Sequence, residues 1–147
     1  MAVIAHYVLN DVPANRTYDI KLETYGSYRV TYSTVDDAEN TAGTPVIFNV
    51  TDKEKAVIVL SRNNITTAKK GTTVVLAPFT AVDNHTDSAL MVTCCFVIPP
   101  DGIIRTINMK DCNSFVASVA GTYVLRYMAK DEAGNITIEN HTLVVTE

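Results

Sequence analysis

Residues 121–147 read GTYVLRYMAKDEAGNITIENHTLVVTE, and this stretch decides the fold. Two runs rich in Val, Ile, Thr and Tyr flank the polar segment 131–135. Apolar and polar side chains alternate in the first run, as they do in a strand with one buried face. Gly134 can take the left-handed conformation that a tight hairpin turn requires. The stretch therefore predicts two antiparallel strands joined by a short turn.

A second copy of this stretch lies 95 residues earlier in the chain. Residues 26–52 read GSYRVTYSTVDDAENTAGTPVIFNVTD and align with residues 121–147 without a gap. A weaker match relates residues 3–10 to residues 92–99. The chain therefore contains an internal repeat. The identical pairs in the strong match include Gly26 and Gly121, Tyr28 and Tyr123, Tyr32 and Tyr127, Asp36 and Asp131, Ala38 and Ala133, and Asn40 and Asn135.

The two copies differ in length. Residues 54–89 have no counterpart in the first copy, so we expect a complete repeat over 54–147 and a partial repeat over 1–53 that lacks its opening strands. Seven strands at this spacing predict a two-sheet sandwich for the complete repeat. They are expected near residues 55–60, 72–76, 90–98, 103–109, 114–118, 122–130 and 136–146.

Five short motifs of the complete repeat resemble the bacterial immunoglobulin-like domain family, whose members occur in tandem on surface proteins and in phage structural proteins. They are the Lys-Lys-Gly-Thr-Thr-Val of 69–74, the Ala-Val-Asp-Asn of 81–84 with Asp87, the Pro-Pro-Asp-Gly of 99–102, the Ala-Gly-Thr-Tyr of 120–123 and the Lys-Asp-Glu-Ala-Gly-Asn of 130–135. The resemblance implies an all-β chain of immunoglobulin-like sandwich repeats that serves as a spacer or binding scaffold. The partial repeat has Glu39 where the pattern has Gly, so we expect a different turn there, with Gly43 as a point of relief.

Tyr28 and Tyr123 occupy the place of the tyrosine corner of sandwich folds, in which a tyrosine hydroxyl bonds to the backbone a few residues upstream. Two residues further on, where antibody domains have a disulfide cysteine, the chain has Val30 and Leu125. The fold is therefore expected not to depend on a disulfide.

Cysteine usage agrees with that expectation. The chain has three cysteines, of which Cys94 and Cys95 are adjacent and Cys112 is separate. Neighbouring strand residues point to opposite faces, so at most one of the adjacent pair faces the core. We expect free cysteines, with a bridge from Cys112 to either partner as the alternative.

Composition and motifs argue against several function classes. The formal net charge of −4 does not provide the basic face that nucleic-acid binding needs. No stretch approaches the roughly 18 apolar residues of a membrane span, and no signal peptide is evident. The histidines, at positions 6, 85 and 141, are scattered, and no common catalytic motif occurs. We therefore expect a chain that is not an enzyme.

Acidic loops form the candidate binding site. Asp83 and Asp87 precede the long strand at 90–98, and Asp131 lies in the hairpin loop. The family resemblance implies that these loops meet at one end of the sandwich, where their oxygens could bind calcium. Alternatively, the carboxylates accept hydrogen bonds from amides of their own turns. No other cofactor is expected.

The incomplete first repeat indicates a function within a larger assembly. Its missing strands would leave an apolar face open, so we expect completion by further sequence or by another chain, or a reduced fold. The leading hypothesis is a structural or adhesive module, outside the cell on a bacterial surface or in a phage head, tail or fibre. Its partners would be other subunits or neighbouring immunoglobulin-like domains. The alternative is an accessory domain of a surface enzyme that binds glycan.

Overall fold

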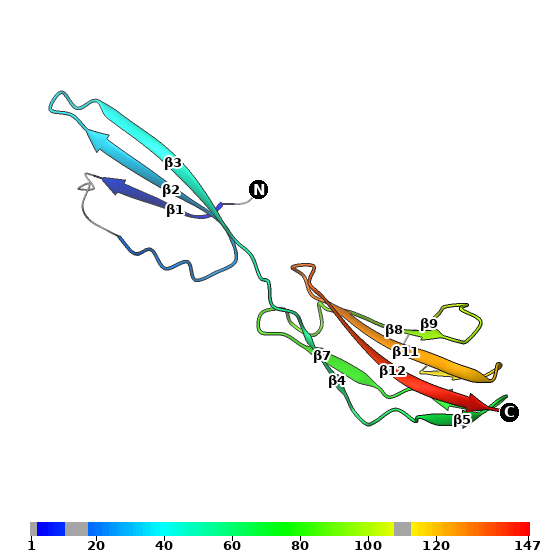
Figure 1. The fold of residues 1–147 in the computed structure, drawn as a ribbon. Coiled ribbons are helices and arrows are strands. Elements are labelled where there is room, and N and C mark those ends of the chain that lie inside the picture. The colour runs from blue at the N-terminus through cyan, green and yellow to red at the C-terminus, as the bar shows by residue number, and fades with distance from the viewer. Residues whose placement is uncertain (1–2, 11–17, 108–112) are drawn as a thin grey trace. The chain divides into compact units, whose positions relative to one another are not determined.

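The computed structural model describes residues 3–10, 18–107 and 113–147, and these residues form strands and loops without helices (Figure 1). No helix that could cross a membrane is present in that part of the chain. The chain divides into two compact units, residues 1–52 and residues 53–147, which we call the first and second units.

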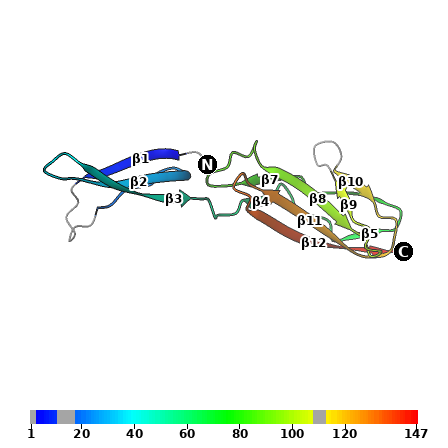
Figure 2. The ribbon, with the colours of Figure 1, turned by 90° about the horizontal axis from the view of Figure 1, so that it is seen from above.

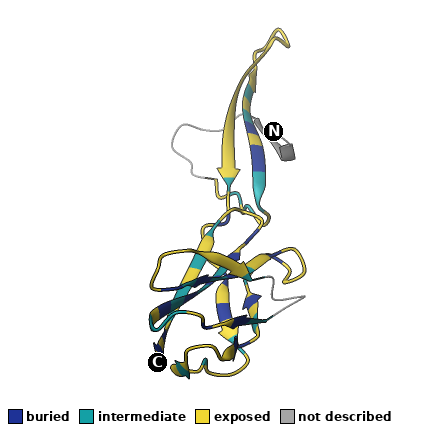
Figure 3. Cartoon of the chain, turned by 90° about the vertical axis from the view of Figure 1, so that its right-hand side faces the viewer, coloured by how far each residue is buried: buried dark blue, intermediate teal, exposed yellow. Residues whose placement is uncertain are grey.

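The described residues of the first unit form one three-stranded sheet. Strands β2 (Gly26–Val35) and β3 (Thr41–Val50) form an antiparallel hairpin in which Tyr28 lies opposite Phe48. Strand β1 (Val3–Asn10) pairs with the other edge of β2 and runs parallel to it. Figure 3 shows that β3 is exposed along most of its length, whereas buried positions of this hairpin lie on β2.

The described residues of the second unit form nine strands in three sheets. The largest sheet has the order β5-β12-β11-β8-β9, and two-stranded sheets are formed by β4 with β7 and by β6 with β10 (Figures 1 and 2). The strands are β4 (Val57–Leu60), β5 (Thr67–Lys69), β6 (Thr73–Val75), β7 (Phe79–Val82), β8 (Val92–Ile98), β9 (Arg105–Ile107), β10 (Ser114–Val116), β11 (Gly121–Lys130) and β12 (Ile136–Thr146).

One hydrophobic core lies between these sheets. The Tyr127 ring meets Phe79 edge-on at a centroid distance of 5.1 Å, and Phe115 packs beside Tyr123 at 5.8 Å. The core therefore joins residues of β11 to residues of β7 and β10, an arrangement consistent with a β-sandwich. Its largest fully buried side chains are Tyr123, Tyr127, Leu76, Leu125, Leu143, Val74, Val97 and Cys95.

Sequence patterns identified most strands of the second unit but missed β5 and β7. Both are short: β5 spans three residues and β7 spans four. A three-residue strand shows too little alternation to be recognised, and Pro78 directly before β7 reads as a breaker. The end of the strand expected at 103–109 lies outside the described residues.

The weaker sequence match, between residues 3–10 and residues 92–99, does not correspond to strands that run in the same direction. Strands β1 and β8 hold the same place beside β2 and β11, but β1 is parallel to its neighbour and β8 is antiparallel to its own. In the second unit the connection from β8 to β11 passes through β10, which belongs to another sheet. The alignment of residues 3–10 with 92–99 therefore does not mark equivalent strands.

The two hairpin loops have the same backbone hydrogen bonds, so the expectation of a different turn at Glu39 was wrong. The Asp36 amide donates to the Asn40 carbonyl at 3.0 Å, as Asp131 does to Asn135 at 3.2 Å. Glu39 takes a φ of 64°, close to the region that Gly134 occupies with a φ of 92°. The hydrogen bonds of the loop impose this conformation on a residue other than glycine. Gly43 has no positive φ and continues β3.

Candidate functional site

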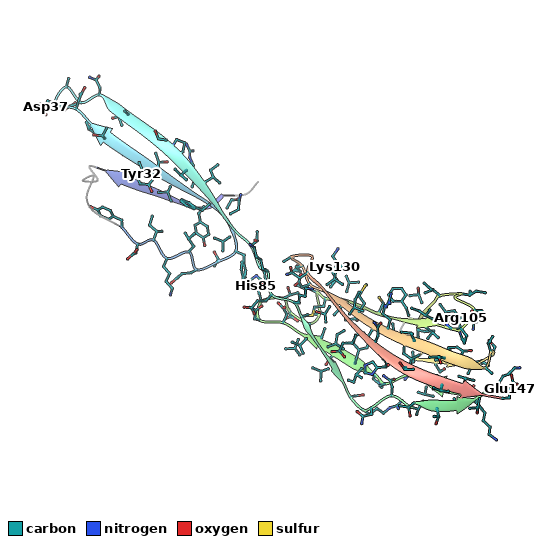
Figure 4. The ribbon with its side chains drawn as sticks, viewed as in Figure 1. Tyr32, Asp37, His85, Arg105, Lys130 and Glu147 are labelled. Carbon is teal, nitrogen blue, oxygen red and sulfur yellow. The ribbon has the colours of Figure 1, made fainter. Side chains whose placement is uncertain are left out.

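The acidic loops between β7 and β8 and between β11 and β12 meet in the second unit. Carboxylate oxygens of Asp83 and Asp131 lie within 4.8 Å of each other. The Thr86 hydroxyl, which is buried, accepts a hydrogen bond of 3.4 Å from the Glu132 amide and so links the two loops. Figure 4 labels His85 in the first loop and Lys130 at the end of β11, directly before the second loop.

Asp83 is held by its own turn. Its Oδ1 atom accepts hydrogen bonds from the amides of His85 at 3.0 Å and Thr86 at 2.8 Å. Its Oδ2 atom is buried and has no hydrogen-bond partner among the described residues. One oxygen therefore stabilises the turn, and the other has lone pairs that no protein donor occupies.

Asp131 organises the hairpin loop. Oδ1 accepts a hydrogen bond from the Asn135 amide, and Oδ2 accepts one from the Asn135 side chain, each at 2.8 Å. Burial acts to raise the pKa of Asp131, but hydrogen bonds from Asn135, Gly134 and Ala133 together outweigh it, so the pKa is lowered. The carboxylate is therefore ionised at neutral pH and stabilises the loop in that form.

Asp87, the third predicted ligand, does not belong to this pair. Its Oδ1 atom accepts a hydrogen bond of 2.9 Å from the Ala89 amide within its own turn. All three aspartates therefore accept amide hydrogen bonds in their own turns, and for Asp83 and Asp131 this is the alternative that the sequence left open. Calcium binding at Asp83 and Asp131 stays a prediction, because carboxylate oxygens are suitable ligands and this pair is close together.

Glu54, which the sequence patterns did not single out, connects both loops to the start of the second unit. Its side chain accepts a hydrogen bond of 2.7 Å from Asn84, and its carbonyl accepts one of the same length from Asn135. The sequence signal was present in the two asparagines, which belong to the motifs at 81–84 and 130–135. What it could not reveal was their shared partner.

Tyr28 and Tyr123 make the same hydrogen bonds in the two units. The Tyr28 hydroxyl donates to the Thr24 carbonyl at 2.7 Å and accepts from the Thr24 amide at 2.9 Å. The Tyr123 hydroxyl donates to the Val119 carbonyl at 2.9 Å and accepts from its amide at 3.0 Å. Each buried ring thereby fixes the chain four residues upstream, where both the backbone amide and the carbonyl of that residue are hydrogen-bonded.

The adjacent cysteines are free thiols with low reactivity. Burial, together with the neighbouring Cys94, raises the pKa of Cys95 to about 12. Burial also raises the pKa of Cys94. Both thiols are therefore protonated at neutral pH, whereas a nucleophilic cysteine needs its thiolate. Cys112 lies outside the described residues.

No family model matches the chain, and a search of the curated proteins finds no similar sequence.

Proposed function

We propose that the chain is a non-catalytic structural or adhesive module built from immunoglobulin-like repeats and displayed on a bacterial surface or a phage virion. The main support is that one hairpin, with the same tyrosine hydrogen bonds and the same loop, occurs in both units. Repetition of one β unit along a chain is the usual construction of proteins that span distance or present surfaces.

The chemistry of the polar groups supports a structural function. Asp83, Asp87 and Asp131 serve as acceptors for the amides of their loops. Cys95 is protonated in the core. These side chains have the roles that a scaffold requires, and an acid, base or nucleophile in catalysis would need its pKa near the working pH.

The proposed partners are other protein subunits or neighbouring immunoglobulin-like domains. Exposed apolar side chains on β3, including Ile47 and Phe48, favour protein contacts. The net negative charge disfavours contacts with nucleic acid.

Location in the native source tests this proposal. An antibody raised against the purified chain should label intact cells or virions in immunogold microscopy, without permeabilisation. Labelling confined to the interior of cells would refute the proposal. A glycan array run on the same protein distinguishes this proposal from the alternative. Saturable binding of one saccharide class would favour a glycan-binding accessory domain of a surface enzyme.

A further inference from the structure

Segment 18–23 of the first unit is the counterpart of β10 in the second. The offset of 95 residues that relates the two hairpins places Ile20 at Phe115 and Leu22 at Ala117. In the second unit this stretch is a strand, because β10 pairs antiparallel with β6 and Phe115 lies opposite Val74. The register continues beyond β10, where the Ala117 amide donates to the Thr72 carbonyl at 3.0 Å.

No strand pairs with segment 18–23 among the described residues of the first unit. Its side chains nevertheless alternate as in a strand: Ile20 and Leu22 are partly buried, whereas Asp19, Lys21 and Glu23 are exposed. Tyr18, Ile20 and Leu22 line an open groove of about 200 Å³ together with Val30, Tyr32 and Phe48 of the hairpin. The segment therefore has the side-chain alternation of a β-strand but no paired strand among the described residues.

Two residues of the groove are exposed at positions that the second unit buries completely. Tyr32 is 43% exposed, and its counterpart Tyr127 is 0% exposed. Phe48 is 43% exposed, and its counterpart Leu143 is 0% exposed. Figure 4 labels Tyr32 on β2 of the first unit. In the second unit the corresponding side chains share one core with Val74 and Leu76, which belong to β6 and its continuation.

We propose that the first unit binds an extended β-segment of another polypeptide, with the chemistry of residues 71–77. The segment would pair antiparallel with residues 19–21, in the register that β6 has with β10. Its alternate apolar side chains would enter the groove and cover Tyr32 and Phe48. The second unit supports this choice of occupant, because Val74 and Leu76 share one core with Tyr127 and Leu143, and Phe79 of β7 meets the Tyr127 ring beside them.

The inference rests on the proposed function, because a module of an assembly has neighbours that can supply a strand. The chain's own residues 71–77 are already paired in the second unit, so we place the source in a different polypeptide. β-strand addition of this kind combines main-chain hydrogen bonds with pockets for alternate side chains.

A synthetic peptide of residues 69–78, labelled with fluorescein, tests the proposal on the full chain. We expect saturable binding in fluorescence anisotropy. We also expect slower hydrogen exchange at residues 18–23 with bound peptide. A control peptide with Val74→Asp and Leu76→Asp should not bind, since charged side chains would enter an apolar groove.

Two matched variants of the chain locate the site. Phe48→Ser should weaken peptide binding at least about tenfold, because Phe48 lines the groove. Ile47→Ser should leave the affinity unchanged, because Ile47 is similarly exposed, at 50%, but points to the opposite face of the same strand. Tyr32→Ser is a second groove variant, and hydrogen exchange of β2 and β3 reports whether each variant retains the hairpin.

Three results would overturn the proposal. They are absence of binding, protection of residues 113–117 in place of 18–23, and concentration-dependent self-association that protects the groove without peptide. The second would mean that the peptide exchanges into the second unit, and the third that another copy occupies the groove. None of these depends on where the protein resides, so failure here is distinguishable from failure of the proposed function.

Discussion

The hairpins β2–β3 and β11–β12 share their strand register, but they differ in what covers them. Tyr28 lies opposite Phe48 in one and Tyr123 opposite Leu143 in the other, and both have the same loop hydrogen bonds. Among the described residues, the second hairpin packs into a hydrophobic core that strands of other sheets complete, and the first hairpin does not. Local hydrogen bonds therefore suffice to define the hairpin, whereas its burial depends on strands contributed from elsewhere in the sequence.

Truncation of the equivalent residues Leu143 and Phe48 should produce the largest contrast. Leu143→Ala removes a fully buried side chain and should cost about 2–5 kcal/mol of unfolding free energy. Phe48→Ala should cost about 1 kcal/mol, because the ring is partly exposed. Urea unfolding with hydrogen exchange resolved by unit would measure both. Equal losses would contradict the difference in burial.

Removal of the tyrosine hydroxyls should affect the two units alike. Tyr28→Phe and Tyr123→Phe each leave an upstream amide and carbonyl without their partner, at a cost of about 1–2 kcal/mol. Thermal unfolding of both variants, followed by hydrogen exchange in each unit, provides the comparison. A loss of stability confined to one unit would show that the contribution of the tyrosine hydrogen bonds depends on the core around them.

The loop residues at the positive-φ position should respond in opposite directions. Glu39→Gly should stabilise the first hairpin by about 1 kcal/mol, because glycine takes a φ of 64° without the steric penalty of a side chain. Gly134→Glu should destabilise the second by a similar amount. A Cβ at Gly134 would meet no atom closer than 4.0 Å, so the backbone conformation alone is tested. Equal signs for the two variants, in chemical denaturation, would contradict this interpretation.

Acid should weaken both loops. Hydrogen bonds from Asn40 lower the pKa of Asp36, and hydrogen bonds from its own loop lower that of Asp131 despite burial. A pKa that is lower in the folded state stabilises the protein above the unfolded value, which is about 3.9, and this stability is lost as the pH falls through the folded value. Melting temperatures between pH 7 and pH 2.5 should fall in that acid range, and Asp36→Asn and Asp131→Asn should each reduce the dependence. An unchanged profile in both variants would argue against these carboxylates as its source.

Calcium should have the smallest effect, and only on the second unit. A site at Asp83 and Asp131 should raise its melting temperature by about 2 °C when free calcium equals the dissociation constant. Asp83→Asn should abolish the rise, whereas Asp87→Asn should preserve it, because Asp87 lies outside the pair. Differential scanning calorimetry with calcium and then with chelator measures this. If chelation leaves the melting temperature of the second unit unchanged, calcium binding at Asp83 and Asp131 is contradicted.

Sequence patterns were most reliable where local chemistry repeats. The alternation around Leu125, the position of Tyr123 and the spacing of Asp131 and Asn135 predicted a hairpin with an ordered loop. They also placed Asp83 and Asp131 among the candidate ligands. They failed for Glu39, since a residue preference is weaker than the several hydrogen bonds that close the loop.

The sequence by itself determined the all-β character and the similarity between residues 26–52 and residues 121–147. Each of these depends on residue order over short distances. Only the tertiary structure decided that Asp83 and Asp131 approach each other, that Glu54 joins their loops, and that Tyr32 is exposed where Tyr127 is buried. Equivalent residues acquire different environments because burial is set by segments distant in the chain, which a local pattern does not encode.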